Sequence, residues 1–536
     1  MTAPAPVTTT PYRSPQAPGR DGFLRLLHAE FTKFRTVRGW VAGLVTAAVV
    51  TVAVGLLGAA GSSIVCNGPD GGACDHTALT GPGGVEVRDA LTFVHRPLTG
   101  DGSVTARITS LTGQYAPEGH AGPGSGGGGL ASGVQPWAKA GVIVKDGTKP
   151  GSAYAAVALT GAHGVRMQYD FTHDTAGLPG KVTADSPRWL RLTRSGGTLT
   201  GYDSTDGIHW TRIGTARPAG LPATVQIGLF TTSPEYVVTS RSLNGSSVDG
   251  GPSTATASFD SVTVRGAAGG DRTGAWTGDT VGADGGPDKN PDLGYRQSGG
   301  TYTLTGSGDV APLVHGRDEP GKSVEDSLIG AFAGLVVVTV VAAMSVTAEY
   351  RRGLIRTTFA AAPRRGRVLA AKAAVVGGLC FVTGLVAALV AVPLVGAVEK
   401  HKHFALHHLS AGTELRIVLG TAGLFAVTGV LALAVGTLLR RSAGAVTAVV
   451  VAIVVPYILA VSGMLPTGPS RWLTRVTPAA AFAVQQSAHQ YAQVTADYSP
   501  GDGYFPLAPW AGFAVLCGYA AVATGLAAVR LRRRDA

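Results

Sequence analysis

The apolar positions of this chain are grouped in two different ways. Six stretches contain no Asp, Glu, Lys or Arg and are each at least 20 residues long: 41–60, 327–346, 373–398, 417–439, 442–464 and 507–529. A helix of ~20 residues spans the ~30 Å hydrocarbon core of a bilayer. Helices of a soluble protein carry an apolar stripe opposite a polar face, whereas these runs are apolar all round. We therefore predict six membrane-spanning helices, the second of them over about 327–347.

The segment 61–326 has shorter apolar runs, which alternate with polar residues and are separated by Gly, Asp, Ser and Pro. Eleven of these runs are predicted strands: 90–95, 103–109, 139–145, 153–159, 164–170, 188–194, 197–203, 209–214, 225–231, 257–264 and 301–305. Short, regularly spaced strands predict an all-β antiparallel sandwich, inserted between the first and second spans. The Gly-rich stretches 121–129 and 266–300 are predicted loops or linkers.

Positive charge divides the connections between the spans into two classes. Lys plus Arg number six before the first run, seven in 347–372, two in 440–441 and four after the last run, against five in 399–416 and 465–506 together. The positive-inside rule then places both termini and the 347–372 loop in the cytoplasm, and the β domain outside the cell membrane. The net charge of +11 would favour a nucleic-acid partner if it lay on one soluble face. The positive charges lie instead in the connections between the spans, so no nucleic-acid partner is predicted.

The N-terminal region divides at about residue 20. Residues 1–20 are rich in Pro, Thr and Ala, and we predict a disordered cytoplasmic tail. In the segment 21–60, Phe23, Leu27, Phe31 and Phe34 recur at helical spacing with basic residues between them. This pattern predicts an amphipathic helix in the inner membrane interface before the first span. A cytoplasmic extension of that span is the alternative.

The four cysteines fall into two pairs. Cys66 and Cys74 follow the first span on the predicted outer side, where they can form a disulfide. Cys380 and Cys517 lie inside apolar runs, where packing is the expected role.

Two stretches of the membrane part, HAEFTKFRTVRGW (28–40) and TAEYRRGLIRTTFAAAPRRGRVLAAK (347–372), resemble the permease subunit of a type-2 ABC transporter. The resemblance implies an ATP-driven exporter that forms its path with a second permease, as a homo- or heterodimer. It also implies separate cytoplasmic ATPase subunits that hold ATP and Mg, so that this chain has no cofactor and is not itself an enzyme. The loop after the second span would contact the ATPase through Glu349, Arg351, Arg352, Gly353 and Ile355, with Pro363, Arg364 and Arg365 leading into the third span.

The inserted domain resembles a concanavalin-like, laminin-G-like sandwich in three stretches: WAKAGVIVKDG (137–147), WLRLTRSGGTLTGYDSTDGIHWTRIG (189–214) and FDSVTV (259–264). Such domains often bind glycans, and a cell-surface glycan is a candidate partner. The aromatic candidates for that contact are Trp137, Tyr154, Tyr169 and Tyr236, with packing in the core as the alternative. In these domains a strand like 301–309 comes first. Here it comes last, which predicts a circular permutation in which 301–305 returns to the sandwich edge; a solvated stalk is the alternative.

Two further motifs are better explained without a ligand. GRDEPGKS (316–323) matches the phosphate-loop pattern, but the predicted topology places it outside and directly before a membrane span. His403 and His407 are four residues apart, as metal ligands can be, yet no Cys or acid completes a clear set, so a solvated His cluster is favoured.

The six apolar runs contain no acid, whereas proton- or sodium-driven transporters usually place ionisable groups in the membrane. This favours energy from a separate ATPase. The rival hypotheses are a membrane-anchored glycan-binding or sensor protein with no transport role, and a hydrolase.

Overall fold

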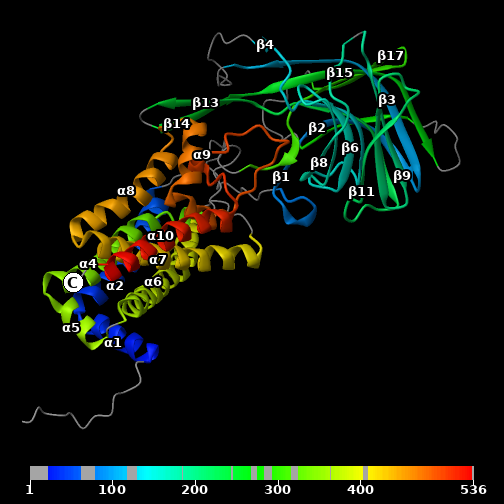
Figure 1. Ribbon diagram of the computed structural model, residues 1–536. Helices are drawn as coiled ribbons and strands as arrows, with labels where there is room; N and C mark the ends of the chain where they lie inside the picture. The colour runs from blue at the N-terminus through cyan, green and yellow to red at the C-terminus, as the bar shows by residue number, and fades with distance from the viewer. Residues whose placement is uncertain are drawn as a thin grey trace, which may run out of the picture.

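The computed structural model describes residues 22–61, 79–117, 130–183, 185–242, 245–266, 275–282, 293–314, 324–362, 364–402 and 409–533. Several predictions concern residues outside these ranges: the tail 1–20, the disulfide between Cys66 and Cys74, the motif 316–323, Pro363, and the pair His403 and His407. The described chain forms a helical bundle and a β domain, which Figure 1 shows side by side.

Within the described residues, six helices are long and apolar enough to cross a membrane: α2 (Arg38–Gly61), α4 (Ala331–Arg351), α6 (Arg365–His401), α7 (Ala411–Leu439), α8 (Ser442–Val461) and α10 (Pro509–Arg533). The prediction of six apolar helices is therefore confirmed. Helix α6 begins eight residues before the predicted 373–398, because its Arg and Lys residues are good helix formers and continue the helix beyond the apolar run. Helix α4 begins at Ala331, four residues later than predicted.

Helix α7 is the centre of the bundle. It packs against α4, α6 and α10, and 72% of its most apolar window is buried, against 22% for α2 and 28% for both α8 and α10. Small residues permit the close approach of neighbouring helices: a Cβ at Gly384 of α6 would lie 2.9 Å from the Phe425 ring of α7. The outer faces of α2, α8 and α10 expose Val and Leu side chains, as expected of helices that face lipid.

Shorter helices lie at both ends of the bundle. A helix is present where the interface helix was predicted, as α1 (Phe23–Thr36), which ends before α2 begins; its place in the membrane interface stays a prediction. Helix α5 (Leu354–Ala361) lies between α4 and α6, and α3 (Val324–Ser327) precedes α4. The connection from α8 to α10 contains α9 (Thr467–Val476) and two 3-10 helices, η2 (Pro478–Gln485) and η3 (Pro500–Asp502). Another 3-10 helix, η1 (Pro82–Gly84), precedes the first strand.

The β domain contains two large antiparallel sheets. The first sheet has the order β11 (Thr211–Ala216), β10 (Thr198–Ser204), β9 (Arg188–Ser195), β3 (Gly102–Tyr115), β15 (Ser253–Gly266), β18 (Thr301–Gly306) and β17 (Gly294–Ser298), with β4 (Ala131–Ser132) paired to β3. The second has the order β16 (Thr277–Val281), β2 (Leu91–Thr99), β12 (Thr224–Thr232), β5 (Lys139–Lys145), β6 (Tyr154–Thr160), β7 (Val165–Tyr169) and β8 (His173–Ala176). All eleven predicted strands are present within these sheets.

The two sheets share one apolar core, to which Val94, Val142 and Val157 of the second sheet and Leu190 and Leu304 of the first contribute. The second sheet is also buried on its other face, so that β5 and β6 are buried at every position rather than at alternate ones. A short strand pair, β1 (Val87–Asp89) with β19 (Val310–Pro312), contributes to the apolar cluster on that face. A second short pair, β13 (Tyr236–Ser242) with β14 (Gly245–Gly251), extends from the domain.

The return of the last predicted strand to the sheet is confirmed. Strand β18 pairs with β15 in antiparallel register, with Tyr302 opposite Phe259 and Leu304 opposite Ala257. Its burial alternates, with Tyr302 and Leu304 inside, so the solvated-stalk alternative is excluded. The prediction that 266–300 is entirely loop is wrong, because β16 and β17 lie within it. Both are short, largely exposed edge strands whose order comes from pairing rather than from apolar pattern.

The β domain contacts the connection between α8 and α10. Ala311 and Val314 pack in one apolar cluster with Val494 and Tyr504. The Gln493 side-chain amide donates to the Phe171 backbone oxygen over 3.2 Å. The 462–508 connection thus forms a base that contacts β19, and Figure 1 shows it between the bundle and the sheets.

Removal of the Leu304 side chain should destabilise the sandwich. We expect Leu304→Ala to lower the free energy of unfolding by about 2–5 kcal/mol, because it leaves a cavity in the core between the sheets. Thr303→Ala, at the neighbouring and partly exposed position, is the control. Denaturant unfolding followed by tryptophan fluorescence measures both, and equal losses would contradict the observed facing of β18.

Candidate functional site

Four charged residues meet where α1, α4 and α6 converge. Helix α1 contributes Glu30 and Lys33, which lie on one face because they are three residues apart. Glu349 lies in the last turn of α4, and Lys372 lies about two turns into α6. Both glutamates and Lys372 are buried, with 6–7% of their surface exposed. We call these four residues the charge cluster.

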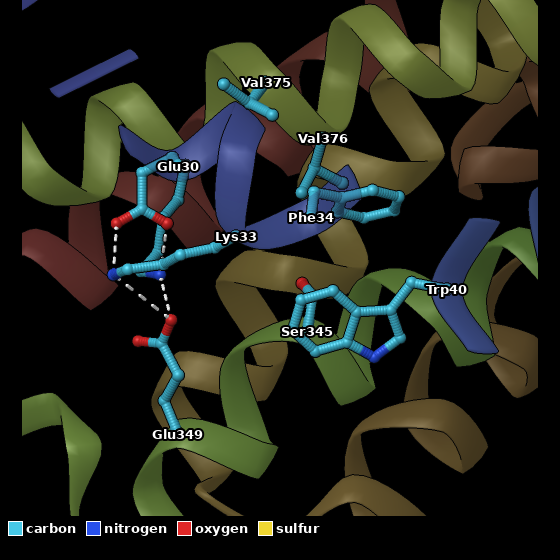
Figure 2. Close-up of a pocket in the computed structure, with 9 residues that line it drawn as sticks. Glu30, Lys33, Phe34, Trp40, Ser345, Glu349, Val375 and Val376 are labelled. Carbon is cyan, nitrogen blue, oxygen red and sulfur yellow. Dashed lines mark hydrogen bonds and ion pairs between the residues drawn. The ribbon is translucent and has the colours of Figure 1, made fainter. Parts of the chain in front are cut away.

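Lys372 is the centre of the charge cluster. Its Nζ lies 2.6 Å from Glu30 Oε2 and 2.5 Å from Glu349 Oε1. Lys33 Nζ lies 2.9 Å from Glu30 Oε1 and 3.7 Å from Glu349 Oε1. Figure 2 shows the side chains of Glu30 and Lys33, from α1, and of Glu349, from α4, pointing toward one another. Two carboxylates and two ammonium groups balance in charge, which is the condition for burying them.

The charge cluster borders a small cavity of about 20 Å³, lined also by Phe34, Trp40, Ser345, Val375 and Val376. That volume is enough for one water molecule. Glu349 Oε2 is buried and has no hydrogen-bond partner among the described residues. Glu349 Oε2 can therefore accept one more hydrogen bond.

The charge cluster also holds the short helix α5. Lys33 Nζ lies 3.4 Å from Thr358 Oγ1 of α5. Ile355 of α5 is buried, and the Arg365 guanidinium lies over the Phe359 ring at 5.4 Å. Gly353 links α4 to α5 with a φ of 67°, a left-handed conformation that favours glycine. Helix α5 is therefore docked on the bundle along one side.

The opposite side of this region is exposed and basic. The exposed arginines between α4 and the start of α6 are Arg351, Arg352, Arg356, Arg364 and Arg367. Figure 1 shows α1, α5 and the end of α10 together at the end of the bundle away from the β domain. Exposed basic residues therefore lie in the connection around α5, at this end of the bundle.

The predicted ATPase-coupling residues separate into exposed and buried groups. Arg351, Arg352, Gly353 and Arg364 are exposed, and Arg365 is partly exposed. Glu349 and Ile355, expected at the contact, are buried instead. Glu349 points inward because Lys372 and Lys33 pair with it, so its carboxylate is not on the exposed surface. The contact of the loop with an ATPase stays a prediction.

The sequence analysis missed Glu30, Lys33, Lys372 and Thr358 as members of this site. The available signal was a charge at the edge of each apolar segment: an acid in the interface helix, one acid in the basic 347–372 loop, and a lysine directly before the third run. Nothing in the local pattern showed that these charges are partners.

The four aromatic candidates for glycan contact do not converge. Trp137 and Tyr154 are buried, with 5% and 1% of their surface exposed. Trp137 stacks on His163, Tyr169 on His173, and Tyr236 on Tyr115. Packing, the alternative given for these residues, accounts for Trp137 and Tyr154. A groove of about 720 Å³ on the first sheet, lined among others by Thr303, Thr305, Tyr295 and Arg296, has instead the volume of a ligand site.

A further carboxylate, partly buried, lies near the β domain. Glu325 of α3 accepts hydrogen bonds from the Ser487 backbone N–H, over 3.1 Å, and from the Ser487 hydroxyl. Gly503 lies against it, and a Cβ there would approach Glu325 Oε1 to 2.9 Å. Burial raises the pKa of Glu325 above its ordinary 4.5, and the Ser487 hydrogen bonds only partly oppose this.

The comparisons with known proteins identify the bundle. Six apolar helices and a buried charge cluster at one end define a multi-pass membrane protein. Residues 167–536 match the family model described as ABC-2 family transporter protein, and the chain belongs to this family. It is therefore a membrane permease of an ABC transporter. The match begins within β7, so it includes part of the β domain.

No curated protein matches the chain. Among solved structures, two crystal structures of Scytalido-glutamic peptidase with transition state analogues each cover 42% of this chain and 100% of their own, with 11% and 10% identity and TM-scores of 0.23 and 0.25. A functionally unknown protein from Saccharomyces cerevisiae covers 32% of this chain and 72% of its own, with 14% identity and a TM-score of 0.18. TM-scores of this size carry no argument about fold or function.

Loss of Lys372 should destabilise the bundle strongly. We expect Lys372→Met to lower the free energy of unfolding by about 3–5 kcal/mol, because it leaves two buried carboxylates without their shared partner. Lys400→Met, at an exposed position of the same helix, is the control. Thermal unfolding of the purified protein measures both. Addition of Glu349→Gln to Lys372→Met should restore part of the loss, and a double mutant that is less stable still would contradict the pairing.

The contact of Glu325 should make stability depend on pH. Because burial raises the pKa of this acid, its contribution is complete below about pH 4.5 and is lost as the pH rises through the folded-state pKa. We therefore expect Glu325→Gln to unfold at a higher temperature than the wild type at pH 7, with the difference vanishing below pH 4.5. Glu414→Gln, an exposed position, is the matched control. A destabilised Glu325→Gln at pH 7 would contradict the assigned direction.

Proposed function

We propose that this chain is the permease subunit of an ATP-driven ABC exporter, which forms the translocation path with a second permease and is powered by separate cytoplasmic ATPase subunits. The observation that carries the proposal is the position of α5. The charge cluster and Ile355 dock this helix on the bundle, and exposed arginines beside it form a basic surface at the end of the bundle away from the β domain. When the ATPase subunits close on ATP, they can move the permease only through a contact of this kind.

The charge cluster is suited to pass that movement on. Lys33 contacts α5 through Thr358, and Lys372 binds carboxylates of both α1 and α4. A displacement of α5 by a bound ATPase would therefore move α1, α4 and α6 together. Helix α7 packs against α4 and α6, so the movement reaches the centre of the bundle. Packed helices joined in this way move as units rather than deforming continuously.

The source of energy follows from the composition of the spans. The six charge-free runs contain no acid that could relay protons or bind sodium, and the buried Glu349 and Glu399 lie in the last turns of α4 and α6, outside those runs. In this proposal the energy for transport comes from ATP, which is held with Mg by a partner chain, and this chain has no cofactor of its own. The positive-inside distribution supports cytoplasmic termini and a β domain outside the cell membrane.

The exposed arginines should be required for ATPase binding. We expect Arg351→Glu with Arg352→Glu to weaken co-purification of the ATPase by about tenfold or more, because like charges then face the partner at a surface selected for complementary charge. Arg212→Glu with Arg217→Glu, at exposed positions of the β domain, is the control pair. Thermal unfolding should be unchanged in both.

Unchanged ATPase binding and transport in the Arg351 and Arg352 variant would remove the coupling role and favour the rival, an anchored glycan-binding or sensor protein. Topology is tested separately. In a background without the four native cysteines, Arg352→Cys should react with an impermeant thiol reagent only after the membrane is opened. Labelling in intact cells would reverse the assigned orientation.

A further inference from the structure

Strand β5 carries two buried lysines that each pair with an aspartate at the neck of the β domain. Lys145 Nζ lies 2.6 Å from Asp89 Oδ2, and Lys139 Nζ lies 2.8 Å from Asp309 Oδ1. The two lysines are six residues apart, so their side chains lie on the same face of β5. Lysine is almost never fully buried, yet Lys145 and Lys139 have 0% and 1% of their surface exposed.

Both aspartates lie at the strands that begin and end the β domain. Asp89 is the last residue of β1, and Asp309 directly precedes β19. Strands β1 and β19 pair with each other and are the first and last strands of the β domain, next in chain order to α2 and α3. Both pairs therefore join the centre of the second sheet to the two chain segments nearest the membrane helices.

The surroundings of the two pairs differ. Lys139 Nζ also donates to the Val310 backbone oxygen over 2.7 Å, and Asp309 Oδ1 accepts from the Val310 N–H over 2.8 Å, which stabilises a charged pair. Lys145 Nζ also donates to a backbone oxygen, that of Ser152 over 3.1 Å, but it lies in addition 5.8 Å and 5.9 Å from the ring centres of Tyr154 and Phe171. Both rings are themselves buried, so they keep water away from the Lys145 and Asp89 pair.

The atoms of Asp89 are arranged unequally. Oδ2 accepts from Lys145 and, over 2.7 Å, from the Gly151 backbone N–H. Oδ1 is buried and has no hydrogen-bond partner within the part of the chain that the structure describes. Burial raises the pKa of Asp89 and lowers the pKa of Lys145, although each partner opposes the effect. Both shifts reduce the cost of forming the neutral acid and the neutral amine, which are the forms that can condense.

We propose that Lys145 and Asp89 join in an intramolecular amide bond, which ties β5 to β1 covalently. The neutral Lys145 Nζ attacks Cγ of the protonated Asp89 carboxyl. Negative charge develops on Oδ2, where the Gly151 N–H already donates. The bond from Cγ to Oδ1 breaks, and Oδ1 leaves as water with the acid proton and one proton from Nζ.

In this condensation one carboxylic acid and one amine give one amide and one water. It needs no oxidant, nucleotide or metal. The fold supplies what the uncatalysed reaction lacks, since it holds the amine and the carboxyl in contact away from water. We expect no bond between Lys139 and Asp309, where Nζ and Oδ1 both hydrogen-bond to the Val310 backbone. The proposal does not depend on the transport function.

Peptide mass spectrometry of the purified full-length protein tests the bond. Digestion with trypsin should give a branched peptide that joins the segments of Lys145 and Asp89, lighter than the sum of the two by one water. Trypsin should not cut after Lys145, because an acylated lysine is not recognised. Peptides containing Lys139 and Asp309 are the internal control, and they should be recovered unlinked with their full masses.

Lys145→Arg should abolish the branched peptide while keeping a positive charge at the site. The wild-type digest decides the question even if this variant folds poorly. Recovery of wild-type Asp89 and Lys145 in separate peptides of unmodified mass, with cleavage after Lys145, would overturn the proposal. A bond at Lys139 would overturn the distinction between the two pairs.

Discussion

The helical bundle depends on one buried lysine that holds two carboxylates from different helices. Lys372 Nζ lies within 2.6 Å of both Glu30 and Glu349, so it joins α1, α4 and α6 at a single point. Three charges buried at the edge of a membrane protein are costly when separated and stable only together. This condition determines where α1 lies and orients the end of α4. It also places Lys33 where it reaches α5.

The same physical constraint recurs in the β domain. Lys139 and Lys145 are buried beneath β1 and β19 and are tolerated because Asp309 and Asp89 meet them there. In both places, charge pairs join the segments at which one structural unit is attached to the next. The charge cluster attaches α5 to the bundle, and the two lysine–aspartate pairs attach the β domain to its connecting strands. Apolar packing builds each unit, while buried pairs of a lysine with a carboxyl group specify how the units are joined.

Much of the fold could be predicted because hydrophobic patterning is a local property. The six charge-free runs are long enough to be recognised by length alone, and the eleven strands by their alternation. The edge strands β16 and β17 were missed, since they are short, polar and largely exposed, and only pairing with β2 and β18 orders them. The base formed by 462–508 was missed for a similar reason, because its order comes from contacts with α10 and the β domain.

The sequence by itself determined the number of apolar helices and the positive charge of the 347–372 loop, because composition and periodicity carry this information. The permease class was indicated by the resemblance of the stretches 28–40 and 347–372 to that family. Only the tertiary structure decided which charges are partners. Glu30 and Lys372 are 342 residues apart, and Asp89 and Lys145 are 56 apart. The position of a charge in the sequence does not identify a partner so far along the chain. Such residues become neighbours only when the helices and sheets pack against one another. For that reason Glu349 looked like an exposed contact in the sequence and is a buried partner of Lys372 in the fold.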